Sequence, residues 1–331
     1  MLQLRRSASR RIGPELVAQL TQRHLRNPVN PMTQEGTHPR RLLSWTGERM
    51  VPWSDEASVI HEHLHRYLFS EQFVDGKVVL DLGSGEGYGS DILARRAKTV
   101  VGVELDPVAV AHAVLQYDAL NLSFVEGSVL KLDDFVDSSV DVVVCFEVIE
   151  HISDQERLVG GVARVLRPEG LFIVSTPDRA VYNEALGYPN PYHLKELDRG
   201  EFQALLAGHF AHVTMYGQRA VAGSMLSPLD GTGEARTDAA RQVVQYEEGR
   251  WKLVASPPPK YFLAIASQQP LPSMPQDCLL VDSGLEGVPE TSFRNRHPIL
   301  GVAVMGGRSV AHLVRKRLAL FMREWNRRRE S

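Results

Sequence analysis

A strand that breaks into a glycine-rich turn constrains this chain more than any other feature of its sequence. Residues 78–82 read Val-Val-Leu-Asp-Leu, an apolar run typical of a strand buried on both faces of a parallel sheet. Glycine then occupies every second position from Gly83 to Gly89, and residues 90–97 have a helical pattern. Glycine allows sharp turns and lets a ligand approach the main chain closely. The order of strand, glycine turn and helix therefore predicts a nucleotide-type binding site.

The spacing of these glycines narrows the choice of ligand. The dinucleotide fingerprint Gly-x-Gly-x-x-Gly is broken because its third glycine would fall at Tyr88. The pattern is instead Asp-x-Gly-x-Gly-x-Gly, beginning at Asp81, and a second strand over residues 99–103 ends in Glu104. A carboxylate at this place can accept hydrogen bonds from both hydroxyls of a ribose. An NAD site or an ordinary strand–turn–helix unit are the alternatives, but a ribose acceptor without a pyrophosphate turn favours S-adenosylmethionine (SAM).

On these residues the chain resembles the class I SAM-dependent methyltransferases, from about His61 to about Ser267. The resemblance implies an α/β fold: a Rossmann-like, seven-stranded, mostly parallel sheet with helices on both faces and one antiparallel strand in an edge hairpin. It also implies that SAM lies along the ends of the first two strands, with Arg66 and Tyr67 as the candidates to bind its carboxylate. Ser128 stands where family members usually carry an acid that reaches the adenine amine. The expected cofactor-binding residues are Asp81, Gly83, Ser84, Gly85, Gly87, Glu104, Leu105, Ser128, Val129, Phe146, Glu147 and Arg66.

The predicted organisation is one methyltransferase domain with two basic additions. Residues 1–41 form a basic N-terminal arm, residues 42–267 the domain, and residues 268–331 a C-terminal extension with a basic amphipathic helix at 309–328. Residues 218–258 are an insertion with no clear strand pattern, and long insertions of this kind are usually lids or binding loops. We expect them to join the last two strands.

Periodicity and turn residues predict the remaining elements of the domain. Residues 167–170 (Arg-Pro-Glu-Gly) read as a turn. Further strands are expected at 122–126, 140–146, 171–176, 211–216 and 260–266, and helices at 58–72, 107–119, 155–166 and 201–206.

Composition restricts the compartment and the partners. Two cysteines, Cys145 and Cys278, cannot supply a disulfide framework or a zinc cluster, so a reducing, cytoplasmic setting is expected. No apolar run reaches the length of a membrane span. The net charge of −3 conceals basic ends around an acidic body, and an acidic body argues against a catalytic face that binds DNA. The basic ends suit peripheral contact with a membrane surface, an acidic partner or a second copy of the chain.

The segment after the strand at 140–146 carries the candidate chemistry. Glu147, Glu150 and His151 follow this strand in the pattern Glu-x-x-Glu-His, and His193 comes from a loop after the next strand. The pattern resembles the metal site of ubiquinone-pathway O-methyltransferases and of small-RNA 2′-O-methyltransferases, which implies Mg²⁺ or Mn²⁺ on Glu147, Glu150, His151 and His193. Helix capping explains the same residues equally well. Without a metal, His151 or His193 is the candidate general base, with Glu150 beside it.

The predicted reaction is O-methylation of a hydroxyl on a sugar, glycan or sugar-bearing natural product. The sugar preference comes only from resemblance, carried by residues 47–52, 62–67 and 190–193. The sequence lacks the Asp-Pro-Pro-Tyr and Pro-Cys signatures of adenine and cytosine methylation. The rivals are a metal-dependent RNA 2′-O-methyltransferase, which the acidic body disfavours, and a SAM-binding module without catalysis.

Overall fold

The computed structural model describes residue 43 and residues 49–52, 57–186, 190–221, 243–247, 250–254, 258–275 and 277–280. The predicted basic arm (1–41) and the predicted C-terminal helix (309–328) lie outside these residues. Within the described part of the chain, no helix has both the length and the apolar character needed to cross a membrane.

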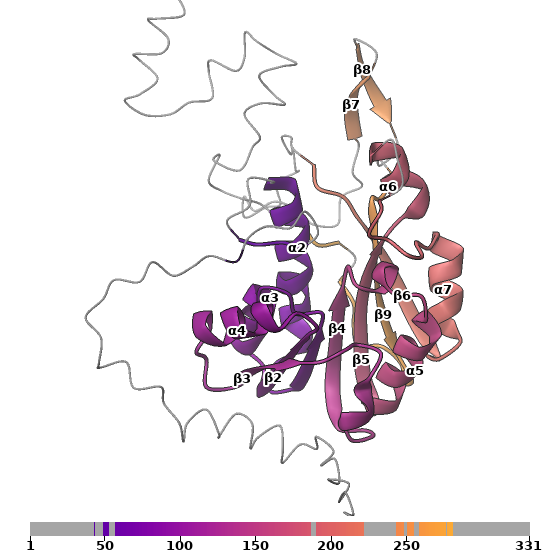
Figure 1. The fold of residues 1–331 in the computed structure, drawn as a ribbon. Coiled ribbons are helices and arrows are strands. Elements are labelled where there is room, and N and C mark those ends of the chain that lie inside the picture. The colour runs from indigo at the N-terminus through magenta and orange to yellow at the C-terminus, as the bar shows by residue number, and fades with distance from the viewer. Residues whose placement is uncertain are drawn as a thin grey trace, which may run out of the picture. The chain divides into compact units, whose positions relative to one another are not determined.

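A seven-stranded sheet organises the described residues (Figure 1). Its strands lie in the order β3-β2-β1-β4-β5-β9-β6. All neighbours from β3 to β5 are parallel, whereas β9 runs antiparallel to both β5 and β6. The predicted sheet, including its antiparallel edge hairpin, is therefore confirmed. The strands are β1 (Val78–Leu82), β2 (Thr99–Glu104), β3 (Leu122–Glu126), β4 (Val140–Phe146), β5 (Leu166–Pro177), β6 (His212–Gln218) and β9 (Tyr261–Ser267).

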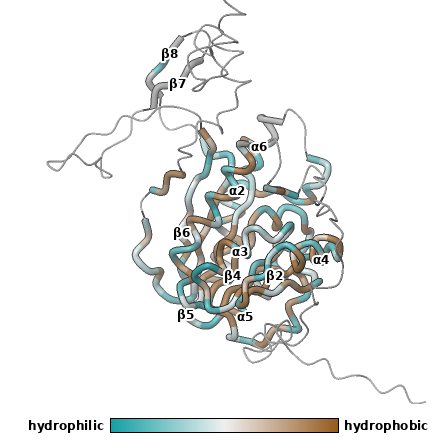
Figure 2. Tube along the Cα trace, turned by 90° about the vertical axis from the view of Figure 1, so that its left-hand side faces the viewer, coloured by the Kyte–Doolittle hydropathy of each residue, from teal (hydrophilic) through white to brown (hydrophobic). Residues whose placement is uncertain are grey.

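Helices cover both faces of the sheet, as parallel strands require. One face packs against α2 (Ala57–Ser70), α3 (Tyr88–Ala94) and α4 (Pro107–Gln116), and the other against α5 (Gln155–Val165) and α7 (Arg199–Ala207). Figure 1 shows these two groups on opposite sides of the strands. Alternate residues of β4 face the two cores: Val143 packs with α5 and Val144 with α2 and α3. Brown, hydrophobic segments gather around β2 and β4 in Figure 2.

Three elements differ from the sequence prediction. Residues 167–170 were predicted as a turn but belong to β5, where they lie in a register shift between Leu166, which pairs with Val140, and Leu171, which pairs with Val142. The insertion contains an unpredicted hairpin, β7 (Val243–Glu247) and β8 (Arg250–Val254), which pair only with each other. A short helix, α6 (Arg179–Leu186), also follows β5. Three 3₁₀ turns, η1 (Glu71–Phe73), η2 (Leu132–Asp134) and η3 (Ile149–His151), complete the domain.

Candidate active site

The glycine turn after β1 has the backbone conformation that only glycine adopts easily. Gly83, Gly85 and Gly87 have φ of 75°, 58° and 104°, in the left-handed region where a Cβ is unfavourable. The N–H of Gly83 donates to the Val103 carbonyl at 2.8 Å, which joins the turn to β2. A Cβ on Gly83 would also lie 2.4 Å from Val148 Cγ2. The predicted loop is therefore present, and its shape depends on its glycines.

Glu104 at the end of β2 is fixed across this loop. One carboxylate oxygen, Oε2, accepts a hydrogen bond from the N–H of Gly85 at 3.0 Å, and Oε1 accepts one from the N–H of Asp106 at 3.0 Å. Its side chain is 13% exposed, so this carboxylate has a fixed orientation and remains partly accessible. A carboxylate held in this way suits the two hydroxyls of a ribose.

The carboxyl end of β3 lies beside Glu104. Glu104 pairs in register with Glu126 at the end of β3, and its carbonyl accepts from the N–H of Gly127 at 2.9 Å. Leu105, which is 70% exposed, and Ser128 follow these neighbouring strand ends. The Ser128 hydroxyl accepts from the N–H of Leu130 at 3.3 Å. The expected adenine side of the site is thus assembled from two strand ends, while the contacts of its residues with SAM stay a prediction.

A buried carboxylate network supports the back of the glycine loop. Glu86 is fully buried, and its carboxylate accepts from the Tyr117 hydroxyl at 2.5 Å and lies 2.6 Å from His112 Nε2. Both partners belong to or follow α4, so the network joins α4 to the loop. Sequence reasoning missed this contact, because no local pattern links residues separated by a strand.

Asp81 near the end of β1 is completely buried. It accepts hydrogen bonds from Ser90 Oγ at 2.6 Å and from the Tyr67 hydroxyl at 3.2 Å. Burial raises its pKa to about 7, against the opposing effect of these two hydrogen bonds and with a smaller upward contribution from the negative charge of Glu104. Asp81 therefore changes charge close to neutral pH.

This titration predicts that SAM binding depends on pH. SAM keeps its positive sulfonium between pH 6 and 8, so ionised Asp81 should favour it and protonated Asp81 should not. With a pKa of about 7, we expect roughly tenfold weaker binding at pH 6 than at pH 8, because only the ionised fraction is competent. Calorimetric titration at both values measures this difference. An Asp81→Asn variant should bind more weakly and lose the dependence; a wild-type Kd that is flat across this range would contradict the role of Asp81.

The helix α2 contacts the loop through Tyr67. The Tyr67 ring packs edge-on against Phe146 at 4.9 Å and against Tyr88 at 5.4 Å. A Cβ on Gly89, at the start of α3, would lie 2.0 Å from Tyr67 Cζ. A side chain at this position would displace a ring that is buried and hydrogen-bonded to Asp81.

A Gly89→Ala variant should therefore lose stability. Overpacking of this kind typically costs about 1–3 kcal/mol, and urea unfolding of the variant should show it as a lower midpoint. Gly161→Ala is the matched control: its Cβ would meet Leu132 at an ordinary 3.4 Å within α5, so it should be neutral or stabilising. Equal stability of the Gly89 variant and the wild type would refute the close packing of Tyr67 on α3.

Glu147 leaves β4 in an unusual conformation. Its φ is 55°, and such values in residues other than glycine often mark functional sites. Its carboxylate accepts from Ser175 Oγ at 2.6 Å and lies 3.3 Å from Arg66 NH1. Both partners come from other elements, β5 and α2, so the orientation of Glu147 is determined by tertiary contacts.

Arg66, a residue of α2, has a side chain that is only 1% exposed. Its Nε donates to Gln218 Oε1 at 2.7 Å, and its guanidinium stacks 4.5 Å from the centroid of the Tyr261 ring. NH1 forms the ion pair with Glu147, and NH2 has no hydrogen-bond partner, which leaves donor capacity on NH2 for a second carboxylate. Arg66 thus contacts β4, β6 and β9 rather than the glycine loop, and its expected contact with SAM stays a prediction.

Three of the four predicted metal-ligating residues come together. Glu150, His151 and His193 each offer a ligand atom, and these atoms lie within 4.8 Å of one another. The His151 and His193 rings are 4.9 Å apart and nearly perpendicular. Glu147 is not among them, because its carboxylate binds Ser175 and Arg66 instead. Among the described residues this is the only such cluster.

The loop that carries His193 is hydrogen-bonded to the η3 turn, which carries Glu150. The Glu150 carbonyl accepts from the N–H groups of Leu194 and Lys195 at 2.8 and 3.1 Å. His193 Nδ1 lies 2.6 Å from Glu196 Oε1, and His151 Nδ1 donates to the Tyr192 carbonyl at 3.1 Å. These contacts orient both imidazoles. Sequence reasoning did not assign a role to Glu196, although its three-residue spacing from His193 is the signal that could have found it.

Glu150 is a buried acid with an unpartnered oxygen. It is 1% exposed, and its Oε2 has no hydrogen-bond partner. Burial raises its pKa well above the ordinary value, and the negative charge of Glu147 raises it further. A buried carboxylate oxygen beside two imidazoles is a mixed oxygen and nitrogen donor set that can hold a divalent cation, and it is poorer in oxygen than the predicted set because Glu147 lies outside it. The residues present therefore fit the expected ion, with Glu147 outside the cluster.

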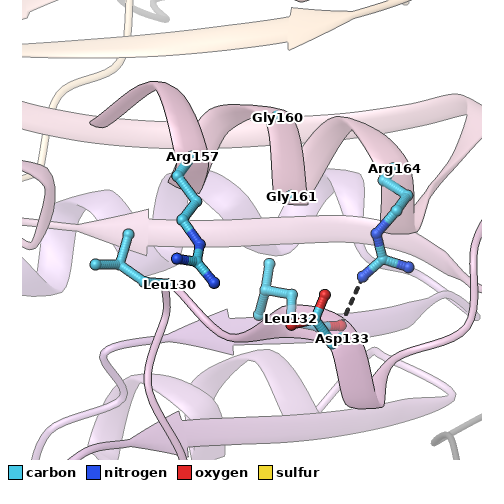
Figure 3. Close-up of a pocket in the computed structure, with 7 residues that line it drawn as sticks. All are labelled: Leu130, Leu132, Asp133, Arg157, Gly160, Gly161 and Arg164. Atoms are coloured by element: carbon cyan, nitrogen blue, oxygen red, sulfur yellow. Dashed lines mark hydrogen bonds between the residues drawn. The ribbon is translucent and has the colours of Figure 1, made fainter. Parts of the chain in front are cut away.

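A separate pocket of about 250 Å³ lies between η2 and α5 (Figure 3). It is lined by Leu130, Leu132, Asp133, Arg157, Gly160, Gly161 and Arg164. None of the residues placed above at the strand ends lines it, so it has no part in the candidate site.

Known proteins are similar to this chain over its central part. A family model described as a methyltransferase domain matches residues 80–174. A probable SAM-dependent methyltransferase of Mycobacterium tuberculosis is 40% identical over 199 residues, which cover 59% of this chain and 70% of that protein. A probable SAM-dependent methyltransferase of Mycolicibacterium smegmatis is 39% identical over 173 residues, 50% of this chain and 63% of that protein. The chain thus spans just under two thirds of the latter.

A ubiquinone biosynthesis O-methyltransferase of Azorhizobium caulinodans is also similar. It is 27% identical over 191 residues, which cover 57% of this chain and 70% of that protein. The matched segment of the family model contains the glycine turn, Glu104 and the segment from Glu147 to His151. With the strand order of the sheet, these similarities lead to one conclusion: the chain belongs to the class I SAM-dependent methyltransferases.

Proposed function

We propose that the protein transfers the methyl group of SAM to a hydroxyl oxygen of a sugar, glycan or sugar-bearing natural product. The observation that carries oxygen as the acceptor atom is the cluster of Glu150, His151 and His193 at the carboxyl ends of the strands. Open α/β sheets bind their ligands at this edge. The ubiquinone biosynthesis O-methyltransferase among the relatives supports an oxygen acceptor, and the segments at 47–52, 62–67 and 190–193 support the sugar.

In the proposed reaction the acceptor oxygen attacks the methyl carbon of the sulfonium, and the carbon–sulfur bond breaks as the carbon–oxygen bond forms. The products are S-adenosylhomocysteine and a methyl ether, and the hydroxyl proton must leave. An imidazole with a pKa near neutrality can take this proton. Where no metal is bound, His151 and His193, oriented by the Tyr192 carbonyl and by Glu196, are the candidate bases.

A divalent cation is part of the proposal. Glu150, His151 and His193 would hold it, and when bound it would lower the pKa of a coordinated hydroxyl. In this proposal Glu147 and Arg66 lie at the boundary between cofactor and acceptor, where Arg66, already paired with Glu147 through NH1, would bind a further carboxylate through NH2.

A transfer assay with methyl-labelled SAM tests the acceptor class. The panel contains sugars, methyl glycosides, catechols and short RNA, each with and without Mg²⁺. The proposal expects label in a carbohydrate as a base-stable methyl ether. Label only in RNA would favour 2′-O-methylation, and label only in phenols would reject the sugar preference. Tight SAM binding with no transfer to any acceptor would favour a module without catalysis.

A further inference from the structure

Arg49 comes from upstream of the matched domain, yet it lies against the residues expected to bind the ribose. Its NH2 donates to Asp106 Oδ2 at 2.9 Å and lies 3.8 Å from Glu104 Oε1. The family model begins only at residue 80. Arg49 is not among the cofactor-binding residues expected from the sequence. The glycine motif and the spaced acid therefore do not mark every residue beside the expected ribose site.

The segment that carries Arg49 is packed on the domain. Met50 and Val51, which follow it directly, are 5% and 0% exposed. The aliphatic part of the arginine crosses the glycine loop, since a Cβ built on Gly85 would lie 3.7 Å from Arg49 Cγ. Its side chain is 18% exposed. The backbone of this segment is held against the domain by buried neighbours, and the Arg49 side chain extends past Gly85 to Asp106.

Two carboxylates meet at this point of the site. Glu104 and Asp106 are separated by one residue, and the N–H of Asp106 donates to Glu104 Oε1. Asp106 also caps α4 by accepting from the N–H of Val108 at 2.9 Å. Like charges this close repel each other, and a guanidinium beside both offsets the repulsion. Arg49 thus connects the ribose acid, the glycine loop and the cap of α4 through one side chain.

We propose that Arg49 is a positioning residue of the SAM site, which holds Glu104 and Asp106 in the arrangement that accepts the ribose. Segment 49–51 is accordingly part of the wall around the adenosine half of the cofactor. This inference rests on the proposed SAM site and adds to it a contribution from outside the matched domain. It concerns adenosine recognition only and is independent of the acceptor.

A double-mutant cycle by calorimetry tests this role. The ligands are SAM, S-adenosylhomocysteine and 5′-methylthioadenosine, which share the ribose and differ at the methionine end. We expect Arg49→Gln to weaken all three by roughly tenfold, the scale of a hydrogen bond to a charged group, and Arg49→Lys to weaken them less. In a Glu104→Gln background the same arginine substitution should change affinity by less than about twofold, because the two residues act together.

Two further variants make the outcome decisive. Arg95→Gln, an exposed arginine at the end of α3, is the matched control and should leave all three affinities unchanged. Asp106→Asn keeps a side chain that can cap α4 but removes the negative charge that Arg49 contacts. It should weaken binding of all three ligands, and it tests the proposal independently if Arg49→Gln does not fold. Equal losses in both backgrounds, or no loss, would overturn the role of Arg49. Wild-type protein that binds none of the three ligands would instead contradict the SAM site itself.

Discussion

Replacing His151 with alanine should reduce methyl transfer by about 10²- to 10⁴-fold, the usual contribution of a general base. His151 lies in the cluster with Glu150 and His193, and its Nδ1 donates to the Tyr192 carbonyl, which orients the imidazole ring. SAM affinity should stay within about twofold, because the imidazole serves the acceptor and not the cofactor. The turnover rate, measured with the acceptor that the transfer assay identifies, reports the loss of catalysis. Calorimetric titration with SAM reports cofactor affinity separately.

His209→Ala is the matched control for this prediction. His209 also pairs with a carboxylate, that of Glu156 at 2.7 Å, but it lies outside the cluster and should leave turnover unchanged. A chelator should mimic the His151 substitution where the divalent cation is required, and added Mg²⁺ should restore the rate. Undiminished turnover of the His151 variant would reject both the base and the metal at this position.

Glu104→Ala should weaken SAM binding by about 1–3 kcal/mol, or about 5- to 150-fold in Kd. The substitution removes a carboxylate that two backbone N–H groups hold in place, and with it the acceptor for both ribose hydroxyls. S-adenosylhomocysteine should lose as much as SAM, since the two ligands share their ribose. Calorimetric Kd values for both ligands check the prediction.

Glu126→Ala is the control for Glu104→Ala. Glu126 is the register partner of Glu104 at the end of β3 and is exposed, so its removal changes the local charge equally without removing a ribose acceptor. SAM affinity should be nearly unchanged in this variant. Normal affinity of the Glu104 variant would mean that the ribose lies elsewhere and that the assignment of the loop is wrong.

The strands of the parallel half of the sheet could be predicted because a buried parallel strand is a local signal. Residues 78–82, 122–126 and 140–146 are runs of apolar residues ended by polar or glycine residues, and β1, β3 and β4 match them. The turn predicted at 167–170 was wrong because Pro168 and Gly170 are turn residues by composition, while the residues on either side, Leu166 and Leu171, pair with β4 and make the segment an irregularity within β5.

The hairpin in the insertion at 218–258 could not be predicted from the sequence. The strands β7 and β8 pair only with each other, so no periodicity imposed by the main core marks them. The antiparallel position of β9 was predicted, but from family resemblance rather than from its residues. Sequence thus predicts an element best where burial against the core dictates the pattern.

In the candidate site, too, some residues could be predicted from local sequence patterns and others could not. The glycine turn and Glu104 could be predicted because their conformation and spacing are encoded within a few residues. The place of Glu147 could not, since Arg66 and Ser175 draw its carboxylate away from His151. Arg49 was missed as well, because its contacts join segments that only the fold brings together. Contacts between distant elements determine these side chains, and no local pattern reports them.

Calorimetric titration of the purified protein with SAM and with S-adenosylhomocysteine tests the central claim most directly. The glycine turn, Glu104 and Asp81 together predict saturable heat with one site per chain for both ligands, and weaker binding of both in the Glu104→Ala variant. Absence of any heat of binding from either ligand would contradict the cofactor site, and with it every role assigned to the residues around it.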